Sequence, residues 1–137
     1  MHMLLEIGRV LIDGGALVLT TPNIASFASV ARLLRASGHP QICSKYANPE
    51  RELADLEVPH VREYTPQELR EATNAAGFEI ASLITEEIAN YNPEIWVGEF
   101  LRRNGYPSNL RGEQTYCVAR KKVGATINRY PDFLYER

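Results

Sequence analysis

Cysteines are scarce in this sequence and none has the spacing of a metal or redox motif. The chain of 137 residues contains two, Cys43 and Cys117, which are far apart and belong to no C-x-x-C pair. A disulfide framework or a zinc site is therefore not expected, and we expect free thiols in a reducing cytoplasm. No cluster of Asp, Glu or His residues has metal-ligand spacing either, so no metal site is expected.

Long apolar runs and a surplus of one charge are also missing. The apolar runs are only a few residues long, whereas a membrane helix needs about 20, and the start lacks the pattern of a signal peptide. A formal net charge of -2 argues against nucleic acid or an anionic membrane as the main partner. We expect a single cytoplasmic domain with no nucleic-acid partner and no membrane partner.

The glycines are never spaced as in a dinucleotide-binding loop. They stand at positions 8, 14, 15, 38, 77, 98, 105, 112 and 124, so no G-x-G occurs. A cradle of closely spaced backbone amides for a phosphate or nucleoside is therefore missing. Gly14 and Gly15 follow a helical pattern, and we expect them to form a turn that stops a helix.

What is present is organised around residues 13–23. Leu4, Ile7 and Leu11 recur at helical spacing and predict an amphipathic helix that ends at the two glycines. The apolar residues 16–19 then predict a strand covered on both faces. Pro22 has no amide proton, so the strand should end there and present Asn23 at its carboxyl end, where open α/β sheets bind ligands.

The rest of the chain alternates helical and strand patterns. We expect a helix over 24–36 that Gly38 ends, and a mobile lid over 39–59, which contains three prolines and no apolar period. Thr65-Pro66-Gln67-Glu68 is a capping box and predicts a helix start. Beyond Gly77 we expect a strand over 78–84, a helix over 94–104, a strand over 115–119 and a packed aromatic tail.

Three blocks carry a family resemblance. Residues 9–15, 17–23 and 60–69, the last followed by Ala76-Gly77-Phe78-Glu79-Ile80, resemble the carboxyl-terminal half of class I S-adenosylmethionine-dependent methyltransferases of the small-molecule or glycan type. The resemblance spans residues 4–121. It implies an α/β, partial Rossmann-like fold: a three-stranded mixed sheet, in the order first, last and middle strand, with flanking helices. Residues 1–121 would form this half-domain and 122–137 an aromatic tail.

The resemblance also implies a function and a cofactor. The chain would be a truncated methyltransferase whose missing amino-terminal half holds most contacts to S-adenosyl-L-methionine, so that the chain alone binds it weakly or not at all and is inactive. Its acceptor would be a small molecule or a glycan. The open edge of the strand over 16–20 would pair with another copy or with a complementing chain. The alternatives are a non-enzymatic protein-interaction module or a degraded remnant of a methyltransferase.

Four residues are candidates for the site. His60 could accept a proton from a methyl acceptor, or it could only support the start of the following helix. Arg62 and Tyr64 could line the acceptor site, but Arg62 could instead form a solvated ion pair and Tyr64 could pack across the helix entry. Asn23 could face the cofactor or the acceptor, although we favour a role as the cap of the helix over 24–36.

Overall fold

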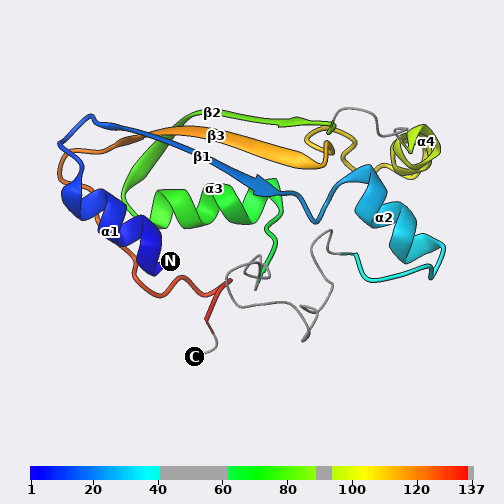
Figure 1. Ribbon diagram of the computed structural model, residues 1–137, viewed down its shortest axis with the longest axis horizontal. Coiled ribbons are helices and arrows are strands. Elements are labelled where there is room, and N and C mark those ends of the chain that lie inside the picture. The colour runs from blue at the N-terminus through cyan, green and yellow to red at the C-terminus, as the bar shows by residue number, and fades with distance from the viewer. Residues whose placement is uncertain (41–61, 89–93, 136–137) are drawn as a thin grey trace, which may run out of the picture.

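The computed structural model describes residues 1–40, 62–88 and 94–135 (Figure 1). It is an α/β arrangement of three strands and four helices. In chain order these are α1 (His2–Val10), β1 (Ala16–Pro22), α2 (Phe27–Leu34), α3 (Pro66–Ala75), β2 (Phe78–Glu86), α4 (Ile95–Arg103) and β3 (Gln114–Lys121). In the described part of the chain, no helix is both long enough and apolar enough to span a membrane.

The three strands form one sheet in the order β1-β3-β2, which confirms the predicted order. Both pairings are antiparallel, with Val18 opposite Val118 and Ser82 opposite Val118. The prediction of a mixed sheet was therefore wrong for the described residues. β1 and β2 do run in the same direction, but β3 separates them, and the one parallel contact is an isolated bridge between Asn23 and Tyr64.

In the described part of the chain, helices cover only one face of the sheet. α1 and α3 lie side by side beneath it in Figure 1, where Leu4 and Leu69 pack with Leu17, Phe78 and Cys117 into the main core. The opposite face, which we call the uncovered face, carries exposed apolar side chains from all three strands. These side chains are Val18, Ile84, Tyr116 and Val118.

The sequence had predicted that β1 is covered on both faces, and this was wrong. Val18 is 69% exposed, while its neighbour Leu17 is buried. Successive strand side chains point to opposite faces, so a run of apolar residues shows no preference for either face, and only the helices decide which one is buried.

Two predicted helix boundaries were also wrong. α2 begins at Phe27 and is capped by Ser26, whose hydroxyl accepts a hydrogen bond from the Ser29 amide at 3.1 Å, and not by Asn23. It ends at Leu34, two residues before the predicted end, and Ala36, not Gly38, adopts the left-handed conformation at φ 50°. The Asn23 side chain is bonded to the carbonyls of Leu110 and Gly112 instead, so the helix begins after Ser26, the next residue along the chain that favours the N-cap position.

The glycine turn and the capping box behave more nearly as expected. α1 ends at Val10, and Gly14 at φ 76° occupies a separate turn closed by the Gly15 amide and the Ile12 carbonyl at 2.9 Å. At α3 the reciprocal hydrogen bonds between Thr65 and Glu68 confirm the capping box.

The carboxyl-terminal tail packs on the main core, as predicted. Phe133 and Leu134 contact the core cluster, and the Asn128 amide donates to the Ala75 carbonyl at 2.8 Å. The predicted lid over 39–59 falls almost entirely on residues 41–61, which lie outside the described residues, so that prediction stays a prediction.

Candidate functional site

Polar side chains gather at the carboxyl end of β1, on the helix-covered face of the sheet. The register places Thr21 and Thr85 opposite Thr115, in a row directly beyond the core row of Leu19 and Cys117. The Thr115 hydroxyl is fully buried and has no hydrogen-bond partner among the described residues. An unpaired buried hydroxyl costs about 1 to 3 kcal/mol, whereas the Thr85 hydroxyl of the same row accepts a hydrogen bond from the Gly112 amide at 3.0 Å.

Asn23 holds the end of β1 to the loop that precedes β3. Its side-chain amide donates to the Leu110 carbonyl at 3.1 Å and to the Gly112 carbonyl at 2.8 Å, while its side-chain oxygen accepts from the Ala25 amide at 2.9 Å. The residue is completely buried. Both hydrogens of its amide group are therefore used inside the protein, and the side chain exposes no surface to a substrate in this structure.

The structure brings Tyr64 to Asn23. The two residues form the parallel bridge, and the Ile24 amide donates to the Tyr64 carbonyl at 3.3 Å. This contact lies on the outer side of β1, just beyond its end. Two of the sequence-predicted site residues, which are about forty positions apart in the sequence, therefore lie side by side.

Arg62 lies beside this pair. Its guanidinium is hydrogen-bonded to the carboxylate of Glu68, and its Cζ lies 5.6 Å from the centroid of the Tyr64 ring. The same Glu68 accepts a hydrogen bond from the Thr65 amide at 2.9 Å in the capping box. Arg62 is thus tied to the start of α3, about half exposed, with its planar face on an aromatic ring. His60 lies outside the described residues, and its predicted role stays a prediction.

Sequence reasoning missed a pair of carboxyl groups at the same end of the sheet. Glu113 precedes β3 and is only 5% exposed, and Glu87 follows β2. Burial, and to a smaller extent the negative charge of Glu113, raises the pKa of the Glu87 carboxyl. A carboxyl with a raised pKa is a candidate for proton exchange, so the exposed Glu87 is a second acid-base candidate beside His60.

A signal for this pair was present in the sequence. Two acidic residues flank neighbouring strands, one just after β2 and one just before β3, and antiparallel neighbours place such positions at the same end of a sheet. The order of the strands had been predicted, but the register that aligns these positions had not.

The groups at this end could form hydrogen bonds and exchange a proton, but they do not form a metal centre. In the described ranges no three His, Cys, Asp or Glu side chains are placed to hold a metal ion. Nor does any described strand lead through a glycine-rich turn into a helix, because β1 reaches α2 through residues 23–26.

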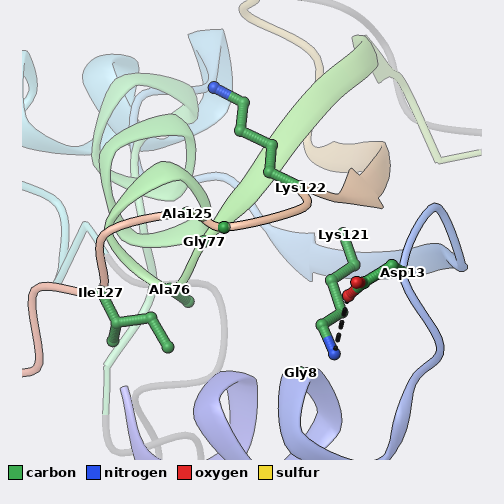
Figure 2. A pocket seen from close by; sticks show the side chains of 9 residues that line it. Gly8, Asp13, Ala76, Gly77, Lys121, Lys122, Ala125 and Ile127 are labelled. Carbon is green, nitrogen blue, oxygen red and sulfur yellow. Dashed lines mark ion pairs between the residues drawn. The ribbon is translucent and has the colours of Figure 1, made fainter.

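A small hollow of about 150 Å³ lies at the opposite end of the sheet (Figure 2). Gly8, Ala76 and Gly77 line it together with the start of the tail. The Lys121 ammonium group at its side donates to the Leu11 carbonyl at 2.7 Å and pairs with Asp13 at 3.4 Å. Of the two lysines that line it, Lys121 is thus already paired; the walls are mostly apolar, and none of the predicted site residues contributes to it.

Comparison with known proteins adds no identification. No protein-family model matches the chain, and a search of curated proteins finds no significant match.

Proposed function

We propose that this chain is the acceptor-side, carboxyl-terminal half of an S-adenosylmethionine-dependent methyltransferase fold and that it does not catalyse methyl transfer by itself. The observation that carries the proposal is the sheet. Its order is β1-β3-β2, its outer strand β1 ends in a polar cluster, and the helices among the described residues cover one face. A doubly wound α/β sheet has helices on both faces, so a sheet covered on one face is what half of such a fold would show. Such sheets bind ligands beyond the carboxyl ends of their strands, which is where the polar cluster lies.

The polar cluster supports the acceptor side over the cofactor side. Tyr64 and Arg62 lie there beside the buried Asn23, and Glu87 and Glu113 lie at the same end of the sheet. Such groups could orient a hydroxyl-rich small molecule or glycan and accept its proton. We derive no step of the reaction through the cofactor, because no strand of the described residues leads through a glycine-rich turn into a helix.

A titration tests the proposal. Calorimetry with S-adenosylmethionine on the purified chain should give no micromolar binding, because a backbone cradle for the cofactor is missing. The DNA upstream of the Met1 codon should encode, in one of its frames, a strand followed by a glycine-rich turn, and a chain extended by that segment should bind the cofactor in the micromolar range.

Each part of the experiment can contradict the proposal. Micromolar binding by the purified chain would mean that the cofactor site is already complete. An upstream region without such a segment in any frame would favour the second candidate, a non-enzymatic protein-interaction module, which the unpaired edge of β1 supports.

A further inference from the structure

The outer edge of β1 carries a short, well-defined set of unpaired backbone groups. At the two ends of the β1-β3 ladder, the Asn23 amide donates to the opposite Glu113 carbonyl at 2.8 Å, and the Lys121 amide donates to the opposite Gly15 carbonyl at 2.9 Å. Along an antiparallel pair, residues whose N–H and C=O groups bond to the neighbouring strand alternate with residues whose groups point away from it. The backbone groups of the odd-numbered residues of β1 therefore point toward β3. The N–H and C=O groups of Ala16, Val18 and Thr20 therefore point outward.

This edge is bounded at both ends. On one side the chain enters β1 from the turn over 12–15. On the other side Pro22 has no N–H group, and beyond it the outward amide of Ile24 is already bonded to Tyr64. Among the described residues no strand lies outside β1, so three donors and three acceptors remain on a stretch of five residues.

We infer that this edge pairs with the same edge of a second copy of the chain. A two-fold axis at Val18 places Ala16 opposite the partner's Thr20 and Val18 opposite the partner's Val18. All three outward N–H groups of each copy then meet a carbonyl of the other, which gives six hydrogen bonds between the copies. The free stretch is symmetric about Val18, so an antiparallel copy satisfies it completely.

The side chains are compatible with this pairing. β1 contains no charged residue, whereas exposed edge strands are usually protected by lysine, by a bulge or by an inward charge. On the uncovered face Val18 contacts the partner's Val18, and on the helix-covered face Leu17 lies opposite the partner's Leu19. Directly opposed apolar pairs stabilise a sheet, and no like charges meet across the axis.

The result is a six-stranded sheet with two-fold symmetry, in the order β2-β3-β1 followed by the same strands of the partner in reverse. Two-fold dimers are the commonest soluble assemblies, and addition of a strand at an edge is a recurring mode of recognition. This inference does not rest on methyl transfer, because no cofactor or acceptor takes part in it.

Charge substitutions at the axis provide the test. In sedimentation equilibrium, the wild-type chain should shift with concentration toward twice the 15.4 kDa mass of one copy. Val18→Lys places two ammonium groups opposite each other and should weaken dimerisation at least about tenfold. Mixing Val18→Lys with Val18→Glu chains should restore a dimer, since the axis then pairs opposite charges.

Ile84→Lys is the matched control. Ile84 lies on the same uncovered face and is likewise exposed, but it belongs to β2 at the other edge of the sheet. Its substitution should leave the dimerisation constant within about threefold of the wild-type value, because the contact between the two β1 strands lies two strands away from Ile84. Circular dichroism should show that all three variants fold, because Val18 and Ile84 contribute little to the core.

Hydrogen exchange of the wild-type chain provides a second readout that needs no variant. The amides of Val18 and Thr20 should become protected as the concentration rises, while those of Leu17 and Leu19 stay protected throughout. The inference is overturned if the chain stays monomeric up to about millimolar concentration, because any dimer with a dissociation constant below about 1 mM would be populated there. It is equally overturned if Ile84→Lys dissociates the dimer as Val18→Lys does, because the uncovered face would then be the contact.

Discussion

At the scale of single residues, Asn23 joins the end of β1 to the loop that precedes β3, which is distant in the sequence. Its side chain binds the carbonyls of Leu110 and Gly112 and the amide of Ala25, all in a fully buried position. Leu110 adopts the left-handed conformation at φ 55°, which a branched side chain disfavours, so this carbonyl is presented to Asn23 at a cost in backbone strain.

Replacement of Asn23 tests its structural role. Asn23→Ala should lower the free energy of unfolding by roughly 2 to 4 kcal/mol, because two buried carbonyls and one amide lose their partner. Asn23→Asp keeps the contact to Ala25 but turns a carboxylate toward the two carbonyls, so it should be less stable at pH 7 than near pH 4. Urea titrations at both pH values measure this, and an unfolding midpoint unchanged by Asn23→Ala would refute the structural role.

At the scale of the elements, the end of α2 offers a paired test of backbone conformation. Ala36 is left-handed, whereas Gly38, the residue expected to end the helix, is not. Ala36→Gly should therefore stabilise the protein by about 0.5 to 1 kcal/mol, and Gly38→Ala should be neutral or slightly stabilising. If thermal unfolding shows that Gly38→Ala is the destabilising member of the pair, the placement of the helix end is wrong.

The elements also show which features a sequence can reveal. The start of α3 was predictable because Thr65, Pro66 and Glu68 are neighbours, and their interactions need nothing else in the chain. Asn23 was assigned a capping role because its partners Leu110 and Gly112 come 87 and 89 residues later, and no local pattern points to them. The carboxyl pair at the end of β2 and the start of β3 was missed for the same reason, since only the register aligns it.

At the scale of the whole molecule, the described residues form two separate cores. The main core lies between the sheet and helices α1 and α3. The second lies between α2 and α4, where Ala31, Val97 and Leu101 are buried. The two are joined chiefly by hydrogen bonds, among them the Arg111 guanidinium to the Ala25 carbonyl at 2.9 Å. In Figure 1 the helix pair stands at one end of the sheet, away from α1 and α3.

The small core should unfold before the large one. Burial of a Val or Leu side chain contributes about 1.5 to 3 kcal/mol, whereas ordering a residue costs about 1 to 2 kcal/mol. The two helices contain 8 and 9 residues, so three buried side chains cannot offset their ordering without the contacts to the sheet. An ion pair between Arg35 and Glu94 at 2.7 Å is half exposed and adds little.

Trp96, the single tryptophan, lies in α4 and therefore reports on the small core alone. Its fluorescence should change at a lower urea concentration than the circular dichroism signal, to which the sheet and all four helices contribute. Val97→Ala should lower the fluorescence midpoint and leave the later part of the dichroism transition in place. Leu69→Ala in the main core should lower both midpoints, with a loss of roughly 2 to 5 kcal/mol. Coincident transitions in the wild-type chain would show instead that the contacts through Arg111 and Asn23 bind the two cores into one cooperative unit.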